Sequence, residues 1–558
     1  MKKLLGPMLY AENQLSPDVW TFSVNLYLSG TDPLRPPPLR LVFLDMEARE
    51  LPGAVKEDPK VVADFSALKS PAAGVLWKWK VSLPRDVQPR RVAYRFEPSV
   101  KGAAAIEGVD DVKDVVVPER GGLPRAAFFS CNGGGSADAW NTVSKMARPF
   151  ACWEDMKEQH QDAQGGFHLL LGGGDQVYAD CIWYSSKELM DFRRLALKDK
   201  LVCELPPGFH DEMVARYVEL YCERWSGSLG IAPMLARVPG LFTWDDHDIF
   251  DGWGSHEHLQ ESPWYRALYS AAAVAFEAFQ LGELKTPDVT PRERKPGQTH
   301  YLQTVRFTGD ACDLDVVMLD LRSGRTTRVK ASGKVEYSVM SDGQWAALDA
   351  WRREHGARPE AGTKHRHVIV VSSVPLVHLR FGTTAENAGG IVDLRDDMLD
   401  QWESVVHRGE RMRLLMDLFK LAKESCCAVT VVAGDVHVGA RAVIHSQNPE
   451  HLLPGRTEAR IEQATSSGIV HPPPGMLEFL GMRLLAGEGP EDLPSSLRTE
   501  MLSVGGDRYL RERNWLSLSV KRPANATTAR SKLWLRWEAE HTSISMQLVV
   551  ESPPLPAR

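Results

Sequence analysis

The sequence lacks any apolar run long enough to cross a membrane. A spanning helix needs about 20 consecutive apolar residues, and no stretch of the 558 residues approaches that length. The N-terminus, MKKLLGPMLYAENQ, carries two lysines, but its apolar run stops at Gly6 and Pro7. A secretory signal needs about 7–15 continuous apolar residues. We therefore expect no membrane span, no export signal and a cytoplasmic location.

Positive charge is not in excess either. The chain has 66 lysines and arginines against 73 acidic residues, which gives a formal net charge of -7. Because a nucleic-acid scaffold is usually basic, we expect no such role. A small anionic substrate is compatible with this balance, since a local site can be positive within an acidic protein.

Cysteine is sparse and has no paired spacing. The eight cysteines are scattered, and two of them, Cys426 and Cys427, are adjacent in an apolar segment. This pattern is typical of reduced, buried thiols and not of a disulfide framework. With 43% hydrophobic and 25% charged residues, the chain has the composition of a soluble globular protein. Its length predicts two or three structural units.

The first 123 residues have the pattern of an all-β domain. Short runs rich in β-branched and aromatic residues are separated by turns such as Pro36–Pro38. In one of these runs Lys78 and Lys80 alternate with Trp77 and Trp79, which indicates a strand with one buried face. The runs are Val19–Leu28, Leu39–Leu44, Val75–Leu83 and Arg91–Phe96. We predict an immunoglobulin-like β-sandwich over residues 1–123.

Residues 124–558 change to an α/β pattern, with further strands at the C-terminal end. Continuous apolar runs predict strands buried on both faces. They are Ala126–Phe129, His168–Leu171, Leu241–Trp244, Asp315–Leu319, His367–Val371 and Ala428–Ala433. The helices expected between them are Glu212–Trp225, Trp264–Leu281, Trp345–His355 and Arg411–Lys423. Antiparallel strands are expected over Trp515–Val520, Lys532–Glu538 and Ser543–Glu551. The alternation predicts an α/β sandwich of sheets covered by helices.

Four of the buried runs end in groups of metal-binding side chains. The segments after these runs are Ser130–Asn132, Gly174–Asp180, Trp244–Asp248 and Gly434–His437. Ligand sites in α/β sheets lie at the carboxyl ends of the strands. We therefore expect these four segments to converge on one place.

The residue types in these segments suit a pair of metal ions. Two ions roughly 3.5–4 Å apart need a carboxylate that bridges them. Asp175 follows an apolar strand and a glycine, and Tyr178 lies three residues further on, close enough to bind the same ion. Phenolate and thiolate ligands favour a ferric ion, whereas magnesium and calcium prefer carboxylate and carbonyl oxygens.

Each of these residues also has a purely structural interpretation. Asp175 and Asp435 follow glycines and could cap the next turn, Tyr178 could be a core aromatic, and Cys131 could be a buried thiol. The acidic cluster Asp245-Asp246-His247-Asp248 is harder to explain in this way. Its carboxylates would repel one another, and a bound cation resolves that repulsion.

The order of the motifs resembles the PhoD-type alkaline phosphatases, within the calcineurin-like metallophosphoesterase superfamily. The motifs are Ser-Cys-Asn, Gly-Asp-x-x-Tyr, Trp-Asp-Asp-His-Asp, Leu-Asp-x-Arg and Gly-Asp-Val-His, and they span about residues 126 to 470 in the family's order. Any one motif is weak, but five in order are strong. An N-terminal β-sandwich also fits the architecture of that family.

The resemblance implies a ligand set for a ferric ion and a second metal. Cys131 and Tyr178 would bind the ferric ion, and Asp175 would bridge the two metals. Metal ligands are also implied at Asp246, Asp435 and His437. Asp435 replaces a histidine of other superfamily members, which favours a harder second metal such as Ca²⁺, with Mn²⁺, Mg²⁺ or Zn²⁺ as alternatives. Relatives supply one more histidine near Ser372–Pro375, where this sequence has none.

The implied reaction is hydrolysis of a small-molecule phosphate ester. His247 stands where relatives carry the histidine that protonates the leaving group or stabilises the transition state. Arg322 and Arg325 follow a buried strand and could clamp phosphate, with Asn132 as a further substrate-binding residue, although Arg322 could instead form a structural ion pair. The alternatives are a phosphodiesterase acting on nucleotides or phospholipids and a non-catalytic binding protein with a degenerate site. The sequence does not decide between monoester and diester, or the oligomeric state.

Overall fold

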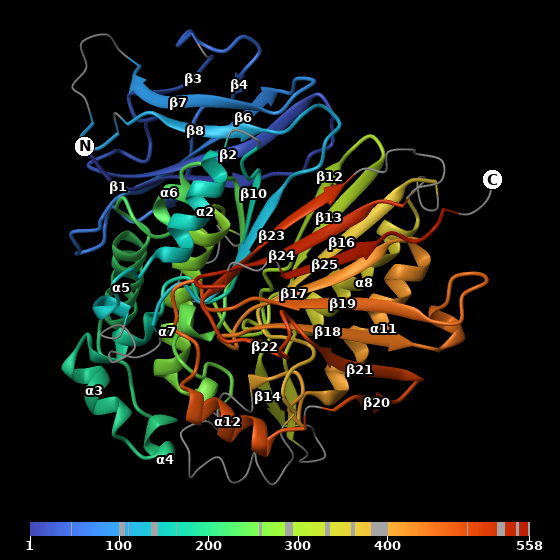
Figure 1. Ribbon diagram of the computed structural model, residues 1–558. Helices are drawn as coiled ribbons and strands as arrows, with labels where there is room; N and C mark the ends of the chain where they lie inside the picture. Colours follow the sequence, from blue (N-terminus) through green and yellow to red (C-terminus); the bar gives the residue numbers. More distant parts are fainter. Residues whose placement is uncertain are drawn as a thin grey trace.

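A computed structural model describes most of the chain, with short gaps. It describes residues 1–45, 47–99, 106–109, 111–134, 143–162, 165–255, 259–284, 294–329, 335–358, 363–380, 400–487, 489–521, 530–542 and 546–555. Two large mixed sheets dominate this part of the chain, with helices on their outer faces (Figure 1). The expectation of a mixed α/β protein is therefore confirmed.

The first large sheet is built around three short parallel strands. These strands are β9 (Ala126–Phe129), β10 (Leu169–Gly173) and β11 (Gly240–Thr243). Antiparallel strands β23 (Asn514–Lys521), β24 (Lys532–Ala539) and β25 (Met546–Glu551) extend it on the β9 side. All three parallel strands are fully buried, as expected for apolar runs covered on both faces.

The N-terminal strands continue this same sheet. Strand β1 (Lys2–Ala11) pairs in parallel with β11 through Tyr10 and Gly240, and β2 (Val19–Ser29) and β6 (Val75–Pro84) follow outward. Short strands β4 (Val55–Lys56) and β5 (Lys60–Asp64) pair with β6. A separate three-stranded sheet contains β3 (Leu39–Leu44), β7 (Arg90–Pro98) and β8 (Lys113–Val117).

A two-layer sandwich does form at the N-terminus, but its larger layer belongs to the central sheet. Phe22 and Val24 on β2 share an apolar core with Leu41 and Phe43 on β3. In β6, Trp77 and Trp79 are buried and Lys80 is exposed, as the alternation predicts. The boundary at residue 123 and the immunoglobulin-like topology stay predictions, since hydrogen bonding between strands runs across that boundary through β1 and β11.

The second large sheet carries the other predicted buried runs. Parallel strands β13 (Cys312–Met318), β16 (His365–Ser372), β17 (Ala428–Ala433) and β19 (Ala459–Thr465) lie side by side. Antiparallel strands flank them: β12 (Gln303–Thr308), β18 (Gly439–Ser446), β20 (Glu491–Leu493), β21 (Leu497–Leu502) and β22 (Tyr509–Leu510). A hairpin of β14 (Thr326–Val329) and β15 (Val335–Ser338) lies outside both sheets.

The helices cover the outer faces of the two sheets. The longer ones are α2 (Ala151–Gln161), α5 (Phe209–Arg224), α7 (Pro263–Phe276), α8 (Asp342–Gly356), α11 (Arg408–Glu424) and α12 (Met476–Leu485). Shorter ones are α3 (Lys187–Arg193), α4 (Leu197–Lys200) and α6 (Ala232–Leu235), and a π-helical turn over Glu277–Leu281 extends α7. None of the described helices is long and apolar enough to span a bilayer.

The core between the two sheets fixes where the strand ends meet. Phe128 and Leu171 of the first sheet share one apolar cluster with Val316, Ile369 and Val432 of the second. Helices α5 and α7 pack on the outer face of the first sheet, and α8 and α11 pack on the outer face of the second. Because the sheets pack face to face, the carboxyl ends of β9, β10, β11 and β17 open on one shared edge.

Candidate metal centre

Five of the predicted ligands have an unusual left-handed backbone. The φ angles are +55° at Cys131, +59° at Asp175, +49° at Tyr178, +69° at Asp435 and +54° at His437. Positive φ is uncommon for residues other than glycine and costs about 1–3 kcal/mol at each position. Such strain gathers at functional sites, where the chain must turn sharply to aim side chains into one place.

Glycines allow these turns to approach one another closely. A Cβ atom on Gly174 would lie 2.7 Å from Cβ of Asp245, and one on Gly434 would lie 2.5 Å from Cβ of Ser130. Gly174 also has φ +105°, which a side chain would rarely adopt. The loops after β10, β11, β9 and β17 are therefore in direct contact at the shared edge.

Asp175 lies at the centre of the candidate site and is almost completely buried. Its Oδ2 atom lies 3.5 Å from Sγ of Cys131 and 3.5 Å from Oη of Tyr178. Its Oδ1 atom has no hydrogen-bond partner within the described part of the chain. A buried carboxylate oxygen without a partner is costly, and a cation would remove that cost.

Three groups of potential ligands share Asp175. Within each group, one ligand atom per residue lies within 4.8 Å of those of the other members. The groups are Cys131 with Asp175 and His437, Asp175 with Asp246 and His247, and Asp175 with Asp245, Asp246 and Asp435. The predicted metal ligands are thus brought together, and one carboxylate lies where it can serve two ions.

Burial and crowding make these acids hard to ionise on their own. Burial raises the pKa of Asp175 and of Asp435 well above the usual range, and the charge of Asp245 raises both further. Burial, together with the charge of Asp175, raises the pKa of the Cys131 thiol. The sulfur, oxygen and nitrogen donors present, including the unpartnered Oδ2 of Asp245, fit bound metal ions.

Asp245 belongs to the third of these groups, although the sequence motifs did not assign it as a metal ligand. Its side chain is 1% exposed and its Oδ2 is unpaired among the described residues. Gln401 approaches the same group, because its Nε2 donates to Oδ2 of Asp435 over 3.0 Å. At Ser373, where the family resemblance predicts a further histidine ligand nearby, the Oγ atom of the serine is buried and unpartnered within the described residues.

His247 faces the centre from the loop after β11. Its Nδ1 lies 2.8 Å from Oδ2 of Asp180, and its ring stacks on Tyr178 with centroids 4.6 Å apart. Asp180 is fixed in turn, since its Oδ1 accepts from the backbone N–H of Asp251. This arrangement fixes the imidazole ring. Its Nε2 lies 4.0 Å from Oδ1 of Asp251.

Asp248 holds two of the site loops together. Its Oδ1 accepts from the backbone N–H groups of Gln176 and Val177, at 2.7 and 3.1 Å. Its Oδ2 accepts from the backbone N–H of Asp245 at 3.1 Å. Asp248 therefore ties the loop that carries Asp175 to the loop that carries Asp245, which explains its buried position in the acidic cluster.

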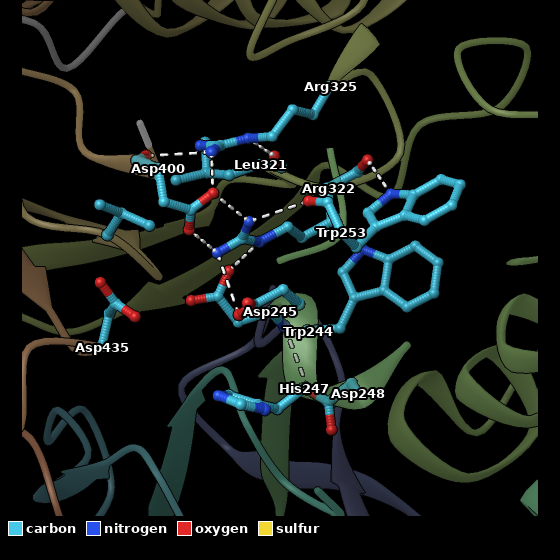
Figure 2. Close-up of polar contacts among 12 residues, drawn as sticks. Trp244, Asp245, His247, Asp248, Trp253, Leu321, Arg322, Arg325, Asp400 and Asp435 are labelled. Carbon is cyan, nitrogen blue, oxygen red and sulfur yellow. Dashed lines mark hydrogen bonds and ion pairs between the residues drawn. The ribbon is translucent and has the colours of Figure 1, made fainter. Parts of the chain in front are cut away.

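Arg322 is fully buried and surrounded by carboxylates (Figure 2). Its Nε donates to Asp245, its Nη1 donates to Asp400 at 2.7 Å, and its Nη2 donates to Asp246 at 3.2 Å and to Asp400. The remaining Nη1 hydrogen faces the carbonyl oxygen of Trp253 at 3.2 Å. All five N–H donors of the guanidinium therefore have protein oxygens within reach.

Arg325 packs on the far side of Asp400 and is 1% exposed. Its Nη1 donates to the Asp400 carboxylate and, over 3.0 Å, to the Asp400 carbonyl oxygen. Burial alone would raise the pKa of Asp400, but Arg322 and Arg325 hold that pKa well below its usual range. Asp400 is thus an ionised carboxylate clamped between two guanidinium groups.

Asn132 lies at the rim of the candidate site, next to Cys131. Its Oδ1 accepts from Nε1 of Trp153 at 2.8 Å, and its Nδ2 donates to the carbonyl oxygen of Gln176 at 3.2 Å. These bonds fix the amide plane and leave one N–H of Nδ2 for another acceptor.

Three residues near the centre were not singled out from the sequence. Asp400 and Gln401 follow no apolar strand, so the pattern of strand ends gives no signal for them. His471 follows β19, which was not expected as a strand, and its ring stacks on His437 with centroids 3.6 Å apart. Its Nδ1 lies 2.8 Å from the carbonyl oxygen of Pro472, which fixes the ring.

The buried donor groups of this site could hold metal ions. Residues 125–335 match the family model described as PhoD related phosphatase. This segment contains β9, β10, β11 and β13 with their site loops, and it confirms the resemblance read from the motifs.

A relative in yeast shows a more distant similarity. The chain is 22% identical over 389 residues to the uncharacterized protein YGR266W of Saccharomyces cerevisiae. The match covers 58% of this chain and 51% of the yeast protein, so the chain spans about half the length of that relative.

Proposed function

We propose that this protein hydrolyses phosphate esters at a two-metal centre. The observation that carries the proposal is the position of Asp175, whose carboxylate is common to three groups of buried ligands. The match of residues 125–335 to a phosphatase family model supports the same reaction. In this proposal the two packed sheets form a metallophosphoesterase sandwich, and the N-terminal strands form an immunoglobulin-like layer beside it.

The ligand groups suit two different metals. We propose that Cys131, Tyr178 and His437 hold a ferric ion together with Asp175, because thiolate, phenolate and imidazole suit that ion. Asp245, Asp246 and Asp435 offer only carboxylate oxygens, which favour Ca²⁺, with Mn²⁺, Mg²⁺ and Zn²⁺ as alternatives. Metals bound in such a pair would supply an acidified water and electrostatic stabilisation of phosphate oxygens.

His247 has the position of a proton donor. Its Nδ1 donates to Asp180 over 2.8 Å, which fixes the ring, and in the imidazolium form His247 would present the Nε2 proton to the leaving oxygen. Stacking on Tyr178 prevents rotation of the ring out of this orientation. Asn132 can donate its remaining amide N–H to a phosphate oxygen.

Arg322 is better suited to orienting carboxylates than to clamping phosphate, whereas Nη2 of Arg325 has no partner within the described residues. Every N–H donor of Arg322 faces a protein oxygen, so a phosphate would have to displace one of those contacts. We propose that Arg322 fixes Asp245 and Asp246 as metal ligands and that Arg325 acts through Asp400. If instead either arginine holds phosphate, replacing it would raise KM without lowering the metal content.

Metal analysis and hydrolysis assays together test the proposed function. The purified protein is expected to contain iron and a second metal, and to hydrolyse an aryl phosphate monoester or diester. The ratio of the two rates assigns the substrate class, including nucleotide or phospholipid diesters. Asp175→Asn should lower turnover by more than the roughly 10–100-fold that loss of an outer partner costs. Asp417→Asn on α11 is the control and should leave turnover unchanged.

A metal-free protein that is inactive on both esters would support the non-catalytic alternative. Ligand binding without turnover would do so even if the metals are present. In either case the strained loops around Asp175 would serve binding alone.

A further inference from the structure

A cavity lies at the end of the second sheet that is opposite to the metal centre. It measures about 600 Å³, which is within the size range of small-molecule sites. Its walls come from the last turn of α11, the start of β17, the segment between β18 and β19, and the end of β25, on the right side of Figure 1. The six residues of β17 separate it from the Asp435 loop by roughly 20 Å.

The charged groups of this cavity are mostly positive. Five cationic side chains line it against three carboxylates: Lys423, Arg441, Arg456, Arg460 and Arg530 against Glu458, Glu462 and Glu551. Arg441 and Arg460 both pair with Glu462, and Arg530 pairs with Glu551.

Two of these cations have no carboxylate partner among the residues that the structure describes. Lys423 donates only to the carbonyl oxygen of Pro449 at 3.3 Å, and the exposed guanidinium of Arg456 has no ion pair there. The cavity therefore has positive charge that the described protein groups do not neutralise.

His451 adds a buried hydrogen-bond donor to the same wall. It is 1% exposed and stacks on Phe419 with ring centroids 5.0 Å apart. Ser446 Oγ accepts from the backbone N–H of Asn448 at 3.2 Å and lies 2.7 Å from Nδ1 of His451. That hydroxyl can be the partner of Nδ1 in either tautomer, so Nε2 is the ring nitrogen that remains for a ligand.

Nε2 of His451 has no partner within the described ranges. A buried ring nitrogen without a partner is unfavourable, and an anionic oxygen would satisfy it when Nε2 carries the proton. Leu453, Pro553 and Pro554 supply apolar surface beside these polar groups.

We propose that this cavity binds a small organic anion, with its phosphate or carboxylate group held by Lys423, Arg456 and Nε2 of His451 and its apolar part against Leu453 and Pro554. The site is separate from the metal centre, and it does not depend on the proposed hydrolysis. The charge excess, the unpartnered donor and the apolar wall together specify this class of ligand.

Calorimetric titration with phenylphosphonate tests the proposal, because its carbon–phosphorus bond resists hydrolysis. Lys423→Ala and Arg456→Ala should each weaken one binding event at least tenfold. Lys198→Ala is the control, since Lys198 on α4 is exposed and does not line the cavity. It should change the dissociation constant less than twofold.

His451→Phe tests the buried donor, since a phenyl ring can keep the stack on Phe419 but has no N–H. It should weaken binding at least tenfold, and because the lost contact with Ser446 should also lower the melting temperature, binding is measured well below the melting transition of the variant. Inorganic phosphate, which lacks the apolar part, should bind more weakly than phenylphosphonate, and equal affinities would contradict the assigned apolar contact.

Identical titrations of wild type, Lys423→Ala and Arg456→Ala would overturn the proposal. Binding at the metal centre does not confuse the result, because the cavity variants should keep aryl phosphate hydrolysis at the wild-type rate. If hydrolysis is absent but the Arg456-dependent event persists, the proposed function fails and the anion site stands.

Discussion

Nη1 of Arg322 donates to Oδ1 of Asp400 over 2.7 Å, and Nη2 of Arg322 faces the other oxygen of that carboxylate. The opposite edge of the same guanidinium contacts Asp245 and Asp246, which belong to the candidate metal ligands. Asp400 thus reaches the metal centre through Arg322, although it comes from a distant part of the chain. Loss of the Asp400 carboxylate should therefore disturb Asp245 and Asp246, which contact Arg322.

Replacing Asp400 with alanine should destabilise the protein and reduce its metal content. The change leaves the buried Arg322 charge with fewer partners, and breaking a buried ion pair costs about 3–5 kcal/mol. Asp417→Ala is a suitable control, because Asp417 is partly exposed and its pair with Lys420 at 3.8 Å should contribute about 0–1 kcal/mol. Urea unfolding and elemental analysis measure the two effects. If Asp400→Ala folds and keeps the wild-type metal content, Asp400 does not position the metal ligands.

Replacing Gly174 with alanine should abolish activity by displacing the bridging carboxylate. The new Cβ would lie 2.7 Å from Cβ of Asp245, at a residue with φ +105°. Backbone strain of this kind costs about 1–3 kcal/mol, and overpacking costs a similar amount, about 1–3 kcal/mol. Turnover of an aryl phosphate and the unfolding free energy are the measurements.

Gly409→Ala is the control for the Gly174 substitution. Gly409 lies in helix α11 with open space around its Cβ position. Alanine favours a helix over glycine by up to about 1 kcal/mol, so this variant should be as stable as the wild type or more stable. A Gly174→Ala protein that keeps wild-type turnover would show that the loop tolerates displacement of Asp175.

The strands and the order of the site motifs were predictable because both depend on local sequence. Apolar runs of four to eight residues mark buried strands, and the polar residues directly after them occupy the carboxyl edge whatever the strand order. This reasoning placed Cys131, Asp175, Asp246 and His437 correctly near one another.

Contacts between distant segments were not predictable in this way. The pairing of Tyr10 on β1 with Gly240 on β11 joins the N-terminal strands to the central sheet, and no local pattern encodes it. The same holds for Asp400, whose partner Arg322 is 78 positions away. An arginine after a buried strand looks the same in sequence whether it faces a phosphate or three carboxylates.

Acid should weaken the fold partly through His168 on the edge of β10. Burial, with the charges of His160 and Arg85, lowers the pKa of His168 to about 3. The unfolded chain binds this proton near pH 6.5, so the stability contribution is complete above about 6.5 and falls as the pH drops toward 3. Between pH 7.5 and 5.0 the loss amounts to about 2 kcal/mol.

The pH effect is measured by urea unfolding of wild type and His168→Asn at both pH values. The asparagine can keep the acceptor that Nδ1 of His168 offers to the Arg125 N–H at 3.0 Å. The unfolding free energy of His168→Asn should change between the two pH values by about 2 kcal/mol less than that of the wild type. The exposed His541 provides the control, and His541→Asn should leave the pH dependence unchanged. A pH dependence unaffected by His168→Asn would assign the acid sensitivity to other groups.

Replacing Tyr178 with phenylalanine should remove the phenolate-to-iron part of the visible absorption while leaving the fold intact. The phenol of Tyr178 lies 3.5 Å from Asp175 and next to the Cys131 group, where a ferric ion is proposed. A phenyl ring can keep the stack on His247, whose centroid is 4.6 Å away, so the loop should hold its shape. Tyr217→Phe is the matched control, because Tyr217 is also fully buried but donates to the carbonyl oxygen of Ile249. If iron is present in both variants and only Tyr178→Phe changes the visible spectrum, the phenolate is a ligand, whereas equal spectra would remove Tyr178 from the ferric ligands.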